Sequence, residues 1–236
     1  MLKPICIIPA RGGSKGVKRK NIRVLGKKPL ISHTIKTALE SNLFQDVIVS
    51  TEDAEIAEIA EKYNAKIPFM RPKKLAKDAT TTEEVLLHTI KELRDLKYDF
   101  NTIMLRDCTV PFIDMQDMKK ALQIFYKNKC DAVFASIKAH PNPYFGMMEI
   151  KKNGYLVQSK IPKSNVTRRQ DSPIVYNVDG MFILNVKHFL KTKKISSILK
   201  IREKLYDLCS KNINKSYIIK YCLKQTLVNI SESKKR

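Results

Sequence analysis

The sequence predicts one α/β domain built on a mostly parallel, doubly wound sheet. Short apolar runs rich in β-branched residues recur as far as Ile137, as is typical of strands buried on both faces. Segments whose apolar residues are spaced three and four apart lie between these runs and indicate helices. Because the two patterns alternate strictly, we expect right-handed crossovers between parallel strands.

The elements of this alternation can be placed in order. A proline at position 29 suits the first turn of a helix, and acidic residues at 52, 53 and 55 suit the start of the next one. The expected strands are residues 5–9, 46–51, 65–69, 102–105 and 131–137. The expected helices are residues 29–39, 52–63, 83–96 and 114–128.

The pattern changes after residue 139. Two short strand-like runs flank an Asn153-Gly154 turn, which predicts an inserted β-hairpin at about 140–165 that acts as a lid or a dimer arm. Residues 174–176 and 181–184 then return to the sheet. Helices near 195–209 and 217–228 are expected to complete a basic helical segment at about 186–236, so that residues 1–236 form a single domain.

Composition restricts the class of protein. The chain has 236 residues, 43% of them hydrophobic, and no apolar run near the roughly 20 residues of a membrane span. No signal peptide is recognised, so we expect a cytoplasmic protein. Five scattered cysteines favour neither a disulfide framework nor a zinc site.

The net charge is +22, and residues 187–236 hold fourteen Lys and Arg against three acids. We interpret this excess mainly as a solvated basic face. Contact with nucleic acid or a membrane surface is the alternative, but no DNA- or RNA-binding motif supports it, and nucleic-acid binding is not expected.

The loop after the first expected strand is the strongest functional signal. Its glycines let backbone N–H groups approach an anion, and Arg11, Lys15 and Lys20 can offset the charge of a triphosphate. It lacks the spacing of a Walker A loop or a dinucleotide fingerprint. A basic surface turn is the alternative. Residues 51–53 also end a strand, where they can meet a ligand or cap a helix.

Several motifs together resemble a known family. They are Ile-Pro-Ala-Arg-Gly-Gly-Ser-Lys-Gly at residues 8–16, Lys20-Asn21, residues 49–53, Arg71-Pro72 with residues 75–78, and Arg169-Gln170 with Pro173. Over about residues 4–185 the chain is similar to the acylneuraminate cytidylyltransferases, the CMP-sialic acid synthetase group.

The resemblance implies a Rossmann-like nucleotidyltransferase fold and a homodimer. It also implies transfer of CMP from CTP to the anomeric hydroxyl of an acidic sugar, such as sialic, legionaminic or pseudaminic acid, with Mg²⁺ and release of pyrophosphate. Nucleotidyl transfer to another acceptor, or a non-catalytic nucleotide-binding relative, is the alternative.

The resemblance also assigns roles to residues. The nucleotide would be bound by Ala10, Arg11, Gly12, Gly13, Ser14, Lys15, Asn21, Arg71 and Thr82. Arg11, Lys15, Lys20 and Asp107 would act in catalysis, and Thr82 would lie near the cytosine. Arg169 and Gln170 would face the sugar. A surface salt bridge is the alternative for Arg169, and a helix cap is the alternative for the threonines before residue 83.

Two departures from the family pattern stand out. Asp107 replaces the usual glutamine, and we expect it to contact substrate and bind Mg²⁺, which prefers oxygen ligands; a helix cap or a pair with Arg106 is the alternative. The usual aspartates near residues 212–220 are absent. Asn177 and Asp179 fall in the family's sugar-pocket stretch, where Asp179 would bind the sugar, replace a metal ligand or act as a base. Cys108 is expected to be a bystander.

Overall fold

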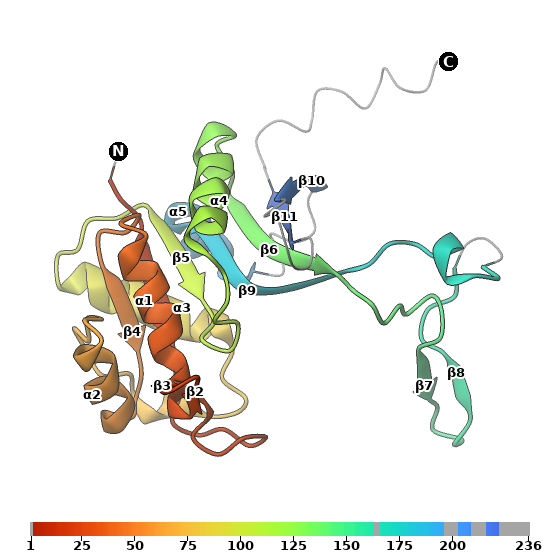
Figure 1. Cartoon of the computed structure of the whole chain (residues 1–236), viewed down its shortest axis with the longest axis horizontal. Coiled ribbons are helices and arrows are strands. Elements are labelled where there is room, and N and C mark those ends of the chain that lie inside the picture. Colours follow the sequence, from red (N-terminus) through yellow and green to blue (C-terminus); the bar gives the residue numbers. More distant parts are fainter. Residues whose placement is uncertain (1, 163–165, 196–202, 209–215, 222–236) are drawn as a thin grey trace.

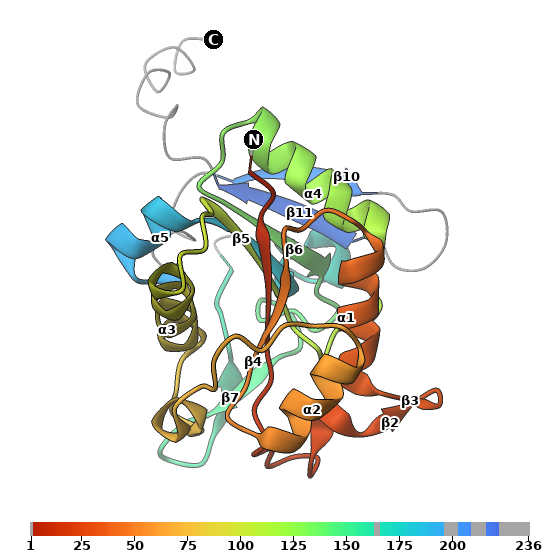
Figure 2. The same cartoon turned by 90° about the vertical axis from the view of Figure 1, so that its left-hand side faces the viewer.

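A computed structural model describes residues 2–162, 166–195, 203–208 and 216–221, and it shows a sheet between two layers of helices (Figures 1 and 2). Within these ranges the sheet has seven strands. From edge to edge they are β10 (Glu203–Leu208), β11 (Ser216–Tyr221), β6 (Ala132–Lys138), β9 (Tyr176–Asn185), β5 (Thr102–Arg106), β1 (Ile5–Pro9) and β4 (Val47–Ser50).

Three neighbouring strands at one side of the sheet, β5, β1 and β4, are parallel, as the sequence predicts. Ile7 of β1 is paired with Ile48 of β4 on one side and with Leu105 of β5 on the other, both in parallel register. The antiparallel strand β9 lies between β5 and β6, with Phe182 opposite both Leu105 and Phe134. This position of β9 is not foreseen from the sequence, because it depends on where the chain re-enters the sheet.

Five described helices cover both faces of the sheet, which confirms the doubly wound prediction (Figure 2). Side chains alternate along β1, so Cys6 and Ile8 pack with α1, α2 and α4, whereas Ile5 and Ile7 pack with α3 and α5. The helices are α1 (Leu30–Glu40), α2 (Ala54–Lys62), α3 (Thr82–Asp95), α4 (Met115–Lys127) and α5 (Val186–Thr192). None of the described helices has the length and apolar character needed to cross a membrane.

Polar caps fix where three of these helices begin. Asp53 accepts a hydrogen bond from the Ile56 N–H at the start of α2, and Asp114 caps α4. Thr81 and Glu84 form a capping box at the start of α3. These caps end the loops at the carboxyl edge of the sheet, so they also fix the walls of the site described below.

The predicted hairpin is confirmed as an element. β7 (Met148–Ile150) pairs with β8 (Leu156–Gln158), and Gly154 supplies the positive φ of 83° in their turn. The hairpin stands away from the sheet at the end of the ribbon formed by β6 and β9 (Figure 1). We call residues 139–175 the arm. At its base the Asn142 side chain donates hydrogen bonds to Ser172 Oγ and the Pro173 carbonyl.

Four of the remaining short elements precede α1 or α3, and the fifth, η3, belongs to the arm. They are β2 (Val24–Leu25), β3 (Lys28–Pro29) and the 3₁₀ turns η1 (Lys20–Ile22), η2 (Lys73–Ala76) and η3 (Arg169–Asp171).

Three sequence predictions need correction. The expected strand at 65–69 is reduced to one parallel bridge between Ile48 and Lys66. The expected helices near 195–209 and 217–228 are wrong for residues 203–208, which form β10, and for residues 217–221, which lie in β11. Other parts of those two predicted helices, residues 196–202, 209 and 222–228, lie outside the described residues.

The reason lies in tertiary pairing. Tyr217, Ile218 and Ile219 favour strands at least as much as helices, and β6 offers them an open edge, where Ile219 is paired with Phe134. Short apolar runs of this kind do not distinguish a strand from a helix by spacing alone.

Candidate active site

The carboxyl ends of the parallel strands β1, β4 and β5 meet at one edge of the sheet, where open α/β sheets bind ligands. A cavity of about 580 Å³ lies at the ends of β1 and β5, and residues 71 and 78 of the loop before α3 also line it. Its lining residues are Pro9, Arg11, Ser14, Lys15, Gly16, Val17, Lys20, Asn21, Arg71, Asp78, Asp107, Cys108 and Thr109. Seven predicted site residues are therefore brought together: Arg11, Ser14, Lys15, Lys20, Asn21, Arg71 and Asp107.

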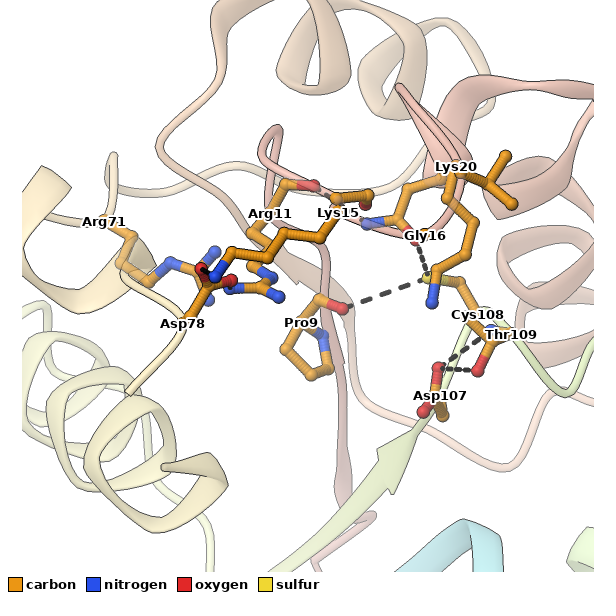
Figure 3. Close-up of a pocket in the computed structure, with 13 residues that line it drawn as sticks. Pro9, Arg11, Lys15, Gly16, Lys20, Arg71, Asp78, Asp107, Cys108 and Thr109 are labelled. Atoms are coloured by element: carbon orange, nitrogen blue, oxygen red, sulfur yellow. Dashed lines mark hydrogen bonds and ion pairs between the residues drawn. The ribbon is translucent and has the colours of Figure 1, made fainter. Parts of the chain in front are cut away.

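Basic side chains converge on one wall of the cavity around a single carboxylate (Figure 3). Arg11 Nη1 lies 2.8 Å from Asp78 Oδ1, and Lys15 Nζ lies 2.7 Å from Asp78 Oδ2. Hydrogen bonds from Lys15 and then Arg11 lower the pKa of Asp78. Asp78 thus forms ion pairs with both of the cations, Arg11 and Lys15, that the sequence analysis expects to contact phosphates. Its role is not foreseen from the sequence, although the loop containing it is.

The loop after β1 is held from behind by a buried amide. Asn21 donates from Nδ2 to the Arg11 carbonyl oxygen at 2.9 Å, and its Oδ1 accepts from Cys108 Sγ at 3.1 Å. Burial raises the pKa of Cys108 to about 12, so the thiol is protonated at neutral pH and cannot serve as a nucleophile. Asn21 and Cys108 therefore join the ends of β1 and β5.

Acidic residues after β4 anchor the same loop. Glu52 Oε1 accepts the Gly12 N–H at 2.8 Å, and Glu52 Oε2 lies 2.6 Å from Arg71 Nη2. Asp53 accepts hydrogen bonds from both terminal nitrogens of Arg19, and the one from Nη2 to Oδ1 is 3.1 Å long. A Cβ on Gly12 would lie only 2.2 Å from Asp53 Oδ2, so a larger residue here would force the Asp53 side chain to move. Residues 52 and 53 thus hold the loop, and Asp53 also caps α2.

Asp107 follows β5 on the opposite wall of the cavity. Its Oδ1 accepts both the backbone N–H and the hydroxyl of Thr109 at 2.8 Å. Neither alternative role from the sequence is found, because α4 is capped by Asp114 and the buried Arg106 donates to Met118 Sδ. No hydrogen bond or ion pair is found for Oδ2 of Asp107 within the described part of the chain.

The backbone also brings Asp179 near this point. The N–H of Asp107 donates to the Gly180 carbonyl at 3.0 Å, and the exposed Asp179 is the preceding residue on β9. Across the described ranges, no group of three or more His, Cys, Asp or Glu side chains is arranged to hold a metal ion. A cation at this site would therefore depend on Asp107 together with oxygens of a bound ligand and water.

Other predicted residues lie outside the cavity lining. Ala10 is buried behind the loop, where its N–H donates to the Ser50 carbonyl, and Gly12 donates to Glu52 instead of facing the cavity. Gly13 is exposed. Thr82 is an exposed residue of α3, whose cap is Thr81. From the loop after β1, the side-chain donors that line this cavity therefore begin with Arg11 and Ser14.

Two of the predicted sugar-facing residues, Arg169 and Gln170, lie on the arm, and Asn177 lies on β9. Arg169 and Gln170 line a cavity of about 480 Å³, and Asn177 lines an adjoining one of about 890 Å³; neither shares a lining residue with the first cavity. The surface salt bridge considered for Arg169 is instead formed by Arg168, which pairs with Asp171 at 3.0 Å. Within the described residues, Arg169 forms no ion pair.

Sequence comparison relates the chain to known proteins. The cytidylyltransferase family matches residues 5–232. A pseudaminic acid cytidylyltransferase of Campylobacter jejuni is 35% identical over 182 residues, 77% of each chain. A CMP-N,N'-diacetyllegionaminic acid synthase of the same species is 36% identical over 191 residues, 80% of each chain.

Structural comparison agrees with this relationship. A solved CMP:2-keto-3-deoxy-manno-octonic acid synthetase complexed with CTP superposes with a TM-score of 0.59 at 18% identity, covering 80% of this chain and 78% of that one. At this level of identity the likeness concerns the fold, and it confirms the predicted nucleotidyltransferase fold.

Proposed function

The chain belongs to the cytidylyltransferase family, and we propose that it transfers CMP from CTP to the anomeric hydroxyl of an acidic sugar, releasing pyrophosphate. The acceptor class is that named for the relatives, which act on pseudaminic and diacetyllegionaminic acids. The observation that carries the proposal is the convergence of Arg11, Lys15, Lys20 and Arg71 on one cavity at the carboxyl edge of the sheet.

The proposed reaction places most of its demand on charge. The sugar hydroxyl oxygen attacks the α-phosphorus, the bond to the β-phosphate oxygen breaks, and the hydroxyl proton leaves to a base or to water. Arg11 and Lys15 would bind the departing pyrophosphate, and Lys20, on the side of Asp107, would lie nearer the reacting phosphate. Phosphoryl transfer of this kind needs positioned cations more than a protein nucleophile.

We also propose that Mg²⁺ binds beside Asp107. Mg²⁺ usually combines one or two carboxylates with substrate phosphates and water, and Oδ2 of Asp107 is the oxygen not taken by Thr109. When bound, the ion would offset the charge that develops on the phosphate oxygens. Thr109 would keep the carboxylate turned toward the cavity, and the exposed Asp179 would lie close enough to act on the sugar hydroxyl.

The sugar-facing half of the site is proposed to come from a second copy of the chain. Arg169 and Gln170 line an arm cavity that is separate from the cavity holding the basic loop, so one copy does not bring both halves together. The arm also exposes large apolar side chains, which favours burial against a partner. Those exposed by more than half are Met148, Ile150, Tyr155, Leu156, Ile161 and Ile174.

A mixing experiment tests this arrangement. Lys15→Ala and Arg169→Ala would each be inactive alone, but a refolded or co-expressed mixture should regain activity if the loop of one copy works with the arm of the other. Sedimentation should give a dimer, and Ile150→Asp with Tyr155→Asp should shift it toward monomer. A monomer at working concentrations, or no recovery on mixing, contradicts the proposal.

The transfer itself is tested by pyrophosphate release. Purified protein is incubated with CTP, ATP, GTP or UTP against pseudaminic, legionaminic, neuraminic and ketodeoxyoctonic acids, and release is expected with CTP and at least one acid. Lys20→Ala should lower kcat, whereas Lys18→Ala, an exposed residue of the same loop that does not line the cavity, should not. Binding of CTP without product in any combination would favour a non-catalytic relative.

The role of Asp107 is tested separately. Asp107→Asn should retain CTP affinity measured in EDTA but lose most activity and its dependence on Mg²⁺ concentration. The exposed Asp99→Asn is the matched control. Unchanged activity in Asp107→Asn would remove the metal role.

We further propose a cytoplasmic location, where free thiols such as Cys6, Cys108 and Cys130 stay reduced.

A further inference from the structure

We propose that Glu52 is a positioning residue for CTP, because its single carboxylate fixes the phosphate-facing loop and Arg71 in one arrangement. The proposal rests on the CTP-dependent transfer described above. Oε1 accepts the Gly12 N–H at 2.8 Å, and Oε2 accepts from Arg71 Nη2 at 2.6 Å. Gly12 directly follows Arg11 in the loop after β1, whereas Arg71 lies on the loop before α3. Glu52 thus connects the loop after β1 with the loop before α3, at two residues that are 59 positions apart along the chain (Gly12 and Arg71).

Burial makes this contact consequential. The side chains of Glu52 and Arg71 are 11% and 3% exposed, so each removes the other's uncompensated charge in a region with little water. Removing one partner of such a pair leaves the other charge buried alone, which is costly. Arg71 therefore depends on Glu52 to keep its place in the cavity lining.

Backbone contacts show that Glu52 is itself firmly placed. The Ala10 N–H donates to the Ser50 carbonyl at 3.0 Å, and the Arg71 N–H donates to the Thr51 carbonyl at 2.8 Å. The backbone at the end of β4 therefore contacts both the start of the loop after β1 and the backbone of Arg71. The side chain of Glu52 adds a second connection between the same two segments. The Gly12 N–H is taken by Glu52, whereas Arg11, Ser14 and Lys15 of the same loop line the cavity.

The two contacts of Glu52 couple the loop after β1 to Arg71 when nucleotide binds. A carboxylate that accepts from both keeps the Gly12 backbone and the Arg71 guanidinium at a fixed separation before CTP arrives. Without this carboxylate, CTP must order both the loop after β1 and the Arg71 side chain on binding, and that ordering weakens affinity. The acceptor sugar, held by other residues, gains nothing from these contacts.

The test is a comparison of KM values for the two substrates. Glu52→Gln keeps the size of the side chain but removes its charge, and its NH₂ group cannot accept from a second donor. Loss of one charge-assisted hydrogen bond predicts a rise of about tenfold or more in the KM and Kd for CTP. The KM for the sugar should stay within about twofold of wild type, far below one tenfold step in affinity. The matched control is Glu58→Gln, an exposed acid of α2.

A purely structural role predicts a different result. It would lower the unfolding temperature and the amount of active protein while leaving the KM for CTP unchanged, and that outcome overturns the proposal. If Glu52→Gln does not fold, Glu52→Asp keeps the charge but is one methylene too short to reach both donors. It should still raise the Kd for CTP, and a wild-type Kd would also overturn the proposal.

A double-mutant cycle with Arg71→Gln adds a second criterion. If Glu52 acts through Arg71, Glu52→Gln should change CTP affinity much less in that background than in wild type, and full additivity is the contrary result. Failure of the proposed function is recognised independently, because wild-type protein would then release no pyrophosphate with any sugar acid, whereas CTP affinity would still report on Glu52.

Discussion

Replacing Gly12 by alanine should destabilise the protein through a single close contact. The added methyl would lie 2.2 Å from Asp53 Oδ2 and 2.9 Å from its Cγ, whereas non-bonded heavy atoms settle near about 3.5–4.0 Å. Gly12 does not have a left-handed φ, so the backbone itself accepts alanine. Asp53 must therefore turn away, and the effect measures what that carboxylate contributes.

The size of the effect follows from the contacts that Asp53 makes. Its cap on α2 is worth about 1 kcal/mol, and its pair with the partly exposed Arg19 adds up to about 1 kcal/mol. The expected loss is about 1–2 kcal/mol, which corresponds to a fall in Tm of about 2–8 °C for a chain of this length.

The assay is thermal and urea unfolding followed by circular dichroism. Gly13→Ala is the matched control, because a Cβ there meets no atom within 4 Å and the residue also lacks a left-handed φ. Most of the cost of Gly12→Ala should disappear in an Asp53→Ala background. Equal Tm values for the two alanine variants, or the same cost in both backgrounds, would refute the reasoning.

Three further outcomes are expected. Asp78→Asn should tighten CTP binding at low ionic strength, because its carboxylate competes with phosphate for two cations of the loop; calorimetry showing unchanged or weaker binding contradicts this. Cys108, whose pKa is raised to about 12 by burial, should resist iodoacetamide in the native protein and react only after unfolding, as peptide mass spectrometry would show; rapid native alkylation is the contrary result. The hydrogen bond from Arg19 lowers the pKa of Asp53 below its ordinary 3.8, so its stabilisation is present above that value and lost as pH falls through the lowered pKa. The stability advantage of wild type over Asp53→Asn should accordingly shrink in acid unfolding, and a constant difference would be inconsistent with it.

The sequence predicts the layered fold well where elements are both long and buried. The runs that became β1, β4 and β5 are apolar and β-branched, and each is followed by a helix with a clear apolar face, so their spacing decides between strand and helix. The same reasoning fails at β10 and β11. There the identity of the element depends on the open edge of β6, which local spacing does not reveal.

The candidate site divides in the same way. Arg11, Lys15 and Lys20 are recognisable because basic residues and glycines directly follow a buried strand. Glu52 and Asp78 are not recognisable in this way, because their importance arises from contacts with Gly12 and Arg11, which lie 40 and 67 positions away from them in the sequence. An acid directly after a buried strand was a usable signal for Glu52, but its partners become known only once the strands are paired.

The position of β9 has a consequence for the order in which the chain can assemble. β9 separates β5 from β6, yet it is made after both of them and after the whole arm. During synthesis from the N-terminus, β1, α1, β4 and β5 can pair while one side of β5 stays open until residues 176–185 leave the ribosome. The open side of β5, the strand that Asp107 follows, is thus paired with β9 only after the whole arm has been synthesised.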